Sequence, residues 1–573
     1  MRSFVNLAAL AGFGIPIFAQ APPPPPGPSN AASPATSTDS STPAKIAPYR
    51  FEIADVHFTP PYRVPFYSGA FLSGDRYIIH QATMTHLVYT AYGLKQGGYV
   101  GGGPSWIHWD RYDIMAKVPP GTTLDTARIM LQNLLAERFK LVAHPADVQV
   151  PAYLLSATNG KPNLKPSTAT EEGSCKPHYP NGPPAQGTVP SIGFECHAVS
   201  IETLANFIGD MASRDYVPYG TPVINATGLK GLYDINLNWT PKFFITQAGA
   251  SGVTLFKALE ALGLSLEFRT APQPGIVIDS VNREPTPNAP DLPAVMPPLP
   301  PPQFEVATIK PSDPNKQQGF ARFMGNEINV QGIPLKFLIQ WAWDLDPRND
   351  DTLVAPKWID SDKLDIQAKV AASDIGNSTM GRTNSMNQDD LRPMLRNLLI
   401  NRFQIKYHME ERPIDAYTLV AEHPKLATAD PREYTGCGTN PGSDGKDPRV
   451  GNPVLDNIQT CVNVTMDQFA GQLHRIAPDY FFYPVVDDTG IKGTWDFTIV
   501  WSSARLAQVG GPGPGQGPAP AATPDGAPTA SEPNGAISVF DAIRKQLGLK
   551  IVKQKHPESV LVIDQISEQP TEN

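Results

Sequence analysis

The chain of 573 residues contains two copies of one long segment. The segment that opens with Phe51-Glu52-Ile53-Ala54 opens again with Phe304-Glu305-Val306-Ala307, and Thr227-Gly228-Leu229-Lys230-Gly231 returns as Thr489-Gly490-Ile491-Lys492-Gly493. The landmarks keep their order while their spacing drifts from 253 to 285 residues. A repeat of this length is a whole domain and not a solenoid unit of about 20 to 50 residues. The sequence therefore predicts two tandem copies of one domain.

Each copy mixes strands and helices in an order that is typical of the α+β class, and each divides into two halves. In the strongest predicted helix, Leu131, Leu135 and Phe139 recur every four residues on one face, and the second copy repeats this stripe between Leu395 and Phe403. We expect short strands at 141–143 and 153–157 after this helix. A later helix at 255–262 should end at a glycine cap, and an apolar strand at 275–281 should close the copy.

The first residues are typical of a secretory signal. Arg2 precedes an apolar stretch of about twelve residues and the small-x-small triplet Ala19-Gln20-Ala21, and a bilayer-spanning helix needs about 20 apolar residues. The alternative, a buried N-terminal helix, fits poorly with the proline run that follows. The expected organisation is a signal peptide at 1–21, a Pro/Ser/Thr-rich spacer at 22–48, the first copy at 49–288, a Pro-rich linker at 289–302, and the second copy at 303–573 with a Gly/Pro-rich loop at 509–535.

The net charge of −9 argues against nucleic acid as a partner, because phosphate binding needs clustered Lys and Arg, and the sequence has no basic run. With a signal peptide and no further apolar run of spanning length, we expect an exported protein, periplasmic or extracellular.

Four cysteines fall two to a copy at matching places: Cys175, Cys196, Cys437 and Cys461. In an exported protein, paired cysteines at equivalent positions predict disulfides, each stabilising the fold by roughly 3 kcal/mol. The alternative is a metal site, but the chain has no Cys-x-x-Cys spacing, and the second pair lacks the nearby histidines of the first. Disulfides are the favoured interpretation.

Several polar residues recur in both copies. His144 and His408 could act as general bases or metal ligands, but strand-edge histidines bonded locally are the commoner case. Arg138 and Arg402 lie in the last turn of their helices, where a cation complements the helix dipole. The four residues are therefore candidate site positions for which the structural interpretation is favoured.

Other aspartates that recur in both copies also have both a functional and a structural interpretation. Asp234 lies beside Lys230, a spacing that predicts an ion pair across a hairpin more readily than an acid/base pair. Asp279 and Asp564 end apolar strands, where turn capping is the commoner use. The sequence has no Gly-x-Ser-x-Gly, phosphate loop or dinucleotide fingerprint, so no catalytic residue, cofactor or metal ligand is predicted.

The sequence resembles an uncharacterised exported-protein family that is expanded in soil acidobacteria, whose domain is also found attached to antibiotic-sensing membrane metallopeptidases. The resemblance rests on the stretch 304–312, on Leu398-Leu399 with Arg402-Phe403, on Asp488-Thr489-Gly490 and on Val562-Ile563-Asp564. It covers both copies. The first copy departs from the pattern at Asp55-Val56-His57. The resemblance implies compartment and architecture but no activity, and the peptidase motif His-Glu-x-x-His is absent from the sequence.

The second half of a copy is also similar to the small periplasmic domains at the N-termini of secretins and related outer-membrane receptors. The similarity lies in a helix, a strand, the Thr-Gly-x-Lys-Gly turn, a second strand and the helix at 255–262. It implies protein–protein contacts as the role of this half.

The sequence leaves two main functions open. The first is an exported binding or protein-interaction module of the cell envelope, with an envelope protein or an unknown small ligand as partner. Duplicated domains on a semi-rigid linker suit bivalent binding. The second is an exported enzyme, possibly a hydrolase of envelope or environmental polymers, which predicts that Arg138, His144 and Asp113 converge on one pocket. A purely structural role for the second copy is a third interpretation.

Overall fold

The computed structural model describes most of the chain from residue 49 onward. The described residues are 49–59, 67–94, 98–158, 162–178, 189–213, 215–218, 220–299, 301–313, 319–324, 326–370, 388–430, 435–442, 447–449, 452, 454–507 and 535–571. The expected signal peptide, the spacer and nearly all of the loop at 509–535 lie outside the described residues.

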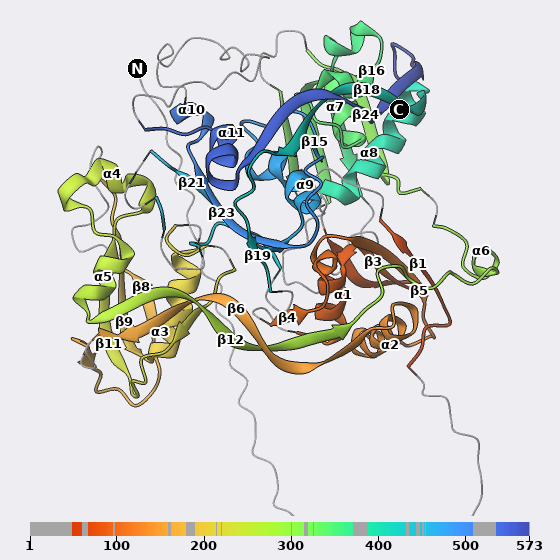
Figure 1. Ribbon diagram of the computed structural model, residues 1–573. Coiled ribbons are helices and arrows are strands. Elements are labelled where there is room, and N and C mark those ends of the chain that lie inside the picture. Colours follow the sequence, from red (N-terminus) through yellow and green to blue (C-terminus); the bar gives the residue numbers. More distant parts are fainter. Residues whose placement is uncertain are drawn as a thin grey trace, which may run out of the picture. The chain divides into compact units, whose positions relative to one another are not determined.

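The first half of the first copy forms a four-stranded antiparallel sheet in the order β1-β5-β3-β2, with two helices (Figure 1). Its elements are β1 Ile53–Phe58, β2 Ser68–Ser73, β3 Arg76–Thr83, α1 Met84–Ala91, β4 Tyr99–Gly102, η1 Ser105–His108, β5 Arg111–Lys117, α2 Leu124–Arg138 and β6 Val142–Ala157. Thr83 and Thr123 cap the two helices by accepting a backbone N–H in the first turn.

The second half repeats this arrangement. Its antiparallel sheet has the order β7-β11-β9-β8, and Ser200 and Thr254 cap its two main helices. Its elements are β7 Lys165–Pro166, β8 Ser174–Pro177, β9 Ile192–Val199, α3 Ile201–Met211, β10 Val223–Asn225, β11 Tyr233–Trp239, η3 Lys242–Phe244, α4 Ile245–Ala248, η4 Gly249–Ser251, α5 Leu255–Ala261 and β12 Leu264–Ser280.

A third sheet, in the order β10-β6-β12-β4, joins the two halves. The strand that ends each half, β6 or β12, pairs with the other along its length, and each also pairs in parallel with a short strand of the opposite half. Figure 1 shows β6 and β12 as a long two-stranded ribbon. Ile276 and Ile278 of β12 are buried in the core of the first half, and Leu155 of β6 is buried in the core of the second. The halves therefore exchange their last strands.

The second copy has the same element order and the same three sheets, β13-β17-β15-β14, β19-β23-β21-β20 and β16-β24-β18-β22. The short helix α6 Leu292–Val295 precedes it within the expected linker. Its elements are β13 Val306–Pro311, β14 Phe320–Met324, β15 Glu327–Pro334, α7 Leu335–Ala342, η5 Asp350–Thr352, β16 Leu353–Val354, η6 Lys357–Asp360, β17 Lys363–Lys369, α8 Gln388–Phe403, β18 Lys406–Ala421, β19 Ala427–Thr428, β20 Gly436–Gly438, β21 Asn457–Val464, α9 Met466–Ile476, β22 Val485–Asp487, β23 Trp495–Trp501, α10 Ala504–Ala507, α11 Val539–Ala542, the π-helical turn Ile543–Leu547 and β24 Leu549–Gln565.

All four halves share one irregularity just before their first helix. One residue there has a positive φ, and the register with the neighbouring strand shifts at or next to it. These residues are Gln81, Ala198, Gly332 and Asn463, with φ of 54°, 52°, 64° and 54°. Together with the matching element order, this shared bulge indicates that each copy is itself built from two versions of one smaller α+β unit.

The prediction of two tandem α+β copies is confirmed, but the strand prediction was incomplete. The expected strands at 141–143 and 153–157 fall at the two ends of the single strand β6, which begins at Val142, and the expected strand at 275–281 falls at the end of the 17-residue strand β12, which ends at Ser280. Pro145, Pro151 and Pro272 interrupt the sequence pattern. The outer edges of the ribbon are paired only over short stretches, with β10 at 153–155 and with β4 at 275–278. The rest of each outer edge is open, and an open strand edge tolerates proline.

Candidate functional site

Both predicted disulfides are present in the structure. Cys175 and Cys196 lie opposite each other on β8 and β9 with Cα atoms 3.9 Å apart, and Cys437 and Cys461 lie opposite each other on β20 and β21 with Cα atoms 4.0 Å apart. Cys196 and Cys461 have no exposed surface and belong to the hydrophobic cores of their halves. Their partners Cys175 and Cys437 are partly buried against the same cores. This burial limits exchange with thiols in solution, as is expected of structural disulfides.

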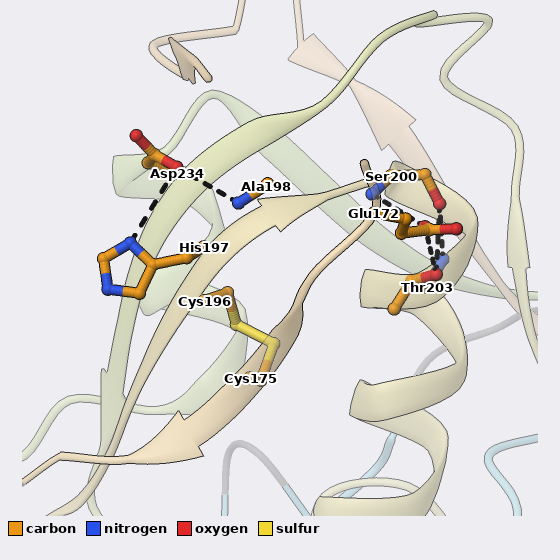
Figure 2. The surroundings of a disulfide bond; sticks show 8 residues. All are labelled: Glu172, Cys175, Cys196, His197, Ala198, Ser200, Thr203 and Asp234. Atoms are coloured by element: carbon orange, nitrogen blue, oxygen red, sulfur yellow. Dashed lines mark hydrogen bonds and ion pairs between the residues drawn. A yellow bond between two sulfur atoms is a disulfide. The ribbon is translucent and has the colours of Figure 1, made fainter. Parts of the chain in front are cut away.

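Polar side chains around the first disulfide form hydrogen bonds that connect neighbouring elements (Figure 2). Glu172 accepts hydrogen bonds from the Ser200 backbone N–H at 3.1 Å and from the Thr203 hydroxyl at 2.6 Å, at the start of α3. Hydrogen bonds from the Ser200 side chain, then from the Thr203 side chain and the Ser200 N–H, lower the pKa of Glu172. A carboxylate at a helix N-terminus also complements the helix dipole. Glu172 therefore anchors the loop before β8 to α3.

Asp234 binds the bulge of its half. Its Oδ1 accepts the Ala198 N–H at 3.1 Å, and Figure 2 shows this bond together with the 3.9 Å approach of His197. Its ion pair is with Lys165, at 3.5 Å, and not with Lys230 as the sequence predicted. The reason is that Lys165 lies opposite Asp234 on the neighbouring strand β7, whereas Lys230 belongs to the preceding turn.

The same contact recurs in the other three halves. Asp113, Asp365 and Asp496 accept the N–H of Gln81, Gly332 and Asn463 at 2.8, 3.0 and 2.8 Å. A buried backbone N–H at a bulge has lost its ladder partner and must find another acceptor. The sequence carries a signal for this role, because each aspartate lies between a large residue and Ile or Phe in the strand: Tyr112-Asp113-Ile114, Tyr233-Asp234-Ile235, Leu364-Asp365-Ile366 and Trp495-Asp496-Phe497.

Arg138 is bound to the end of its own copy. Its guanidinium donates to the Thr286 carbonyl at 2.6 and 3.0 Å, to Asn288 Oδ1 at 2.6 Å and to the Ala54 carbonyl at 3.2 Å. The Thr286 N–H in turn donates to the Arg138 carbonyl at 2.9 Å. Asn288 also donates to Asp55 at 2.6 Å. The arginine therefore fastens the last residues of the copy to its first strand.

Arg402 makes the equivalent contacts in the second copy. It donates to the Thr571 carbonyl at 3.5 Å and to the Ala307 carbonyl at 3.3 Å, and the Thr571 N–H donates to the Arg402 carbonyl at 2.7 Å. Helix-dipole complementarity alone would not have revealed this role. The recurrence of Pro-Thr near the end of both copies, at Pro285-Thr286 and Pro570-Thr571, is the signal that could have revealed it.

His144 and His408 each form a pair with an aspartate that the sequence did not connect to them. His144 Nδ1 lies 2.8 Å from Asp279 Oδ2, and His408 Nδ1 lies 3.0 Å from Asp564 Oδ2. The register explains the pairing, because β6 and β12, like β18 and β24, run antiparallel and bring these positions together. All four side chains are about half exposed.

The first copy also gathers a histidine–aspartate cluster on β1, β3 and β5. His57 Nδ1 lies 3.2 Å from Asp55, His57 Nε2 lies 3.7 Å from Asp113, and His80 Nδ1 lies 3.5 Å from Asp113. Burial raises the pKa of Asp113, but the His80 and Gln81 hydrogen bonds and the histidine charges outweigh it and lower that pKa. The second copy has Lys310 and Gln331 at the positions of His57 and His80, so this cluster belongs to one copy.

Arg138 and Asp113 are linked only indirectly, through Asn288, Asp55 and His57. His144 has its contact with Asp279, and no described contact connects it to this chain of residues. The described side chains therefore do not bring the three residues into direct contact around one pocket.

A hollow of about 90 Å³ lies on the second copy, between α7 and α8. Phe337 and Trp341 of α7, one helical turn apart, form one wall, and Leu345 and Pro347 form another. Its lining also includes Arg392 and Asp344, whose ion pair measures 3.0 Å with both side chains less than a tenth exposed. Phe337 is 46% exposed.

Among the described residues, no three His, Cys, Asp or Glu side chains gather in a way that could hold a metal ion. None of the described helices has both the length and the apolar character needed to cross a bilayer.

Comparison with known proteins gives one match. The sequence matches the family described as "Protein of unknown function (DUF3738)" twice, over residues 85–281 and 336–566. No curated protein and no solved structure matches the chain. One matched region lies within each structural copy, and the two together cover more than half of the chain. The chain therefore belongs to the DUF3738 family and carries its domain twice.

Proposed function

We propose that the protein is an exported, non-catalytic module of the cell envelope that binds another protein. The main support is the use of its recurring polar residues. Arg138 and Arg402 bind the backbone of their own copies, and the aspartates matched across the halves bind bulge N–H groups. The polar residues that recur between the copies are thus explained by their roles in the fold, and their recurrence does not require a shared reaction.

The hollow on the second copy is the surface feature that favours binding of another protein. Phe337, which lines the hollow together with Trp341, is nearly half exposed, and aromatic side chains are enriched at protein interfaces. Export is supported by the signal-like residues 1–21 and by the two disulfides, because disulfides persist in oxidising compartments.

The test is photo-crosslinking of the full mature chain in the native cell envelope, followed by identification of the captured proteins. Deletion of 49–288 and of 303–573 in parallel assigns the contact to a copy. We expect one envelope protein to be captured by the full chain and lost with one of the deletions. Capture of the same set of proteins by every variant, or by an unrelated exported protein, would contradict the proposal.

A hydrolase is the second candidate, and the pairs His144–Asp279 and His408–Asp564 are the observation in its favour. A carboxylate that orients an imidazole is part of many acid–base sites. This alternative predicts that the double substitution His144→Ala and His408→Ala abolishes release of soluble fragments from purified envelope polymers. Absence of any release by the unsubstituted protein removes the alternative.

A further inference from the structure

The long ribbon of the second copy has an open outer edge at the start of β18. On one side, β18 pairs with β24 along its length, and on the other side β22 pairs with it only at 417–419. No other described strand pairs with β18. The residues at 406–411 are all exposed. We call this stretch the β18 edge; its outward backbone groups can pair with a further strand.

A proline shows which backbone groups of β18 point outward. In an antiparallel pair, residues whose N–H and C=O face the partner strand alternate with residues whose groups face away from it. Pro413 has no N–H, so it belongs to the residues that face away from β24. The register is regular from Tyr407 onward, and Met409 and Tyr407 lie four and six residues before Pro413. Their N–H and C=O groups therefore point outward as well.

The first copy protects the same edge with a proline. His408 corresponds to His144, since each pairs with the aspartate near the end of its ribbon, and Met409 therefore corresponds to Pro145. A proline on an edge strand removes a donor and hinders pairing with another chain. In the second copy this protection is missing, and Met409 and its neighbour on the same face, Tyr407, are 49% and 37% exposed.

The sequence of the β18 edge is complementary to itself. When two antiparallel β18 strands meet with His408 opposite His408, Lys406 lies opposite Glu410 and Tyr407 lies opposite Met409. Opposite charges and an aromatic ring beside a thioether are both favourable cross-strand pairs. The same alignment places the outward N–H and C=O groups of Tyr407 opposite those of Met409, so the backbones can exchange hydrogen bonds.

Several side chains of the β18 edge are held in place by their own copy. The Tyr407 ring packs edge-on against Trp343, with ring centroids 5.1 Å apart and planes inclined by 87°. His408 Nδ1 lies 3.0 Å from Asp564 Oδ2. Side chains that are already ordered lose less conformational entropy when a partner strand binds.

We propose that two copies of this chain associate through their β18 edges, antiparallel and with His408 at the two-fold axis. A two-fold contact uses the same surface on both chains and closes, so it gives a dimer and not a fibre. The contact is small, so the dimer should be reversible, with a dissociation constant on the order of 10 μM. The inference goes beyond the proposed envelope function and does not depend on it.

The test is sedimentation equilibrium of the chain 22–573 between about 1 and 200 μM, which spans the expected dissociation constant. We expect the average mass to rise from that of one chain toward that of two. Met409→Pro introduces the residue of the first copy, which folds with Pro145 at the equivalent place. This variant should weaken the dimer at least about tenfold, because each chain loses an outward N–H.

A charge exchange tests the alignment. Lys406→Glu places like charges opposite each other and should weaken the dimer at least about tenfold, and the addition of Glu410→Lys should restore it. Both side chains are exposed, so these variants should fold. The matched control is Val142→Glu at the equivalent position of the first copy, where the side chain is 54% exposed, and it should leave the dimer unchanged.

The mass of a single chain over the whole concentration range overturns the inference. A dimer that Met409→Pro leaves unchanged overturns it as well, because the β18 edge is then not the contact. Failure of Glu410→Lys to restore the dimer of Lys406→Glu overturns the alignment centred on His408.

Discussion

At the scale of single residues, Arg138 makes more contacts that hold its copy together than the other candidate positions do. It donates to the Thr286 carbonyl, Asn288 and the Ala54 carbonyl, so Arg138→Ala leaves several acceptors without a donor. We expect the first copy to lose about 2 kcal/mol of its free energy of unfolding. Hydrogen exchange should show faster exchange at residues 282–288 in this variant. The control is Arg128→Ala on the same helix, whose exposed pair with Asp125 should contribute less than about 1 kcal/mol. Equal effects of both substitutions would contradict this role of Arg138.

His86 makes the stability of the first copy depend on pH. Burial first, and then the charge of Arg111, lowers the pKa of His86 from 6.5 to about 4. The unfolded chain therefore binds this proton at a higher pH than the folded chain, so the stabilisation is complete above pH 6.5 and is lost as the pH falls from 6.5 toward 4. The loss should reach roughly 3 kcal/mol. His86→Gln should reduce the dependence, because Gln468 fills the same position of a capping box in α9 without titrating. Calorimetric unfolding midpoints at about pH 7 and about pH 4.5 test this; an equal drop in both proteins would refute it.

At the scale of the elements, the bulge before the first helix of each half depends on an aspartate of the neighbouring strand. Asp365 is 9% exposed and accepts from the Gly332 N–H at 3.0 Å and from the Ser312 hydroxyl at 2.7 Å. Asp365→Ala leaves the buried N–H without this acceptor and should cost about 2–3 kcal/mol. Asp365→Asn keeps one acceptor oxygen and should cost clearly less, about 1 kcal/mol. Urea unfolding of both variants measures the difference, and similar midpoints would show that the bulge does not need the acceptor.

The same elements show how far the sequence could be interpreted. Helical periodicity located α2 and α8, and the glycine after α5 is the expected cap, with Gly263 at φ 72°. Local patterns failed where partners are distant in sequence. The β6–β12 ribbon joins residues more than a hundred positions apart and contains prolines, and the pair His144–Asp279 exists only because of its register. The cysteines were predictable because both copies repeat them. The hollow was not, because its lining comes from α7, from the segment after α7 and from α8, which is distant in sequence.

At the scale of the whole molecule, the exchange of last strands leads us to expect that one copy, and not one half, is the smallest unit that folds. Leu155 of β6 is fully buried in the core of the second half, and Ile278 of β12 is buried in the core of the first. A fragment of residues 49–157 would expose the apolar side chains of β6 and would lack the apolar side chains that β12 adds to its own core. We expect the fragment 49–288 to unfold in one cooperative transition and the fragment 49–157 to show no such transition in circular dichroism. A cooperative transition in 49–157 alone would mean that each half folds without its neighbour and that the ribbon only connects them. In the second copy, Leu419 of β18 is buried in the core of the second half and Leu561 of β24 in the core of the first. We therefore expect the fragment 303–573 to unfold cooperatively and the fragment 303–421 not to do so.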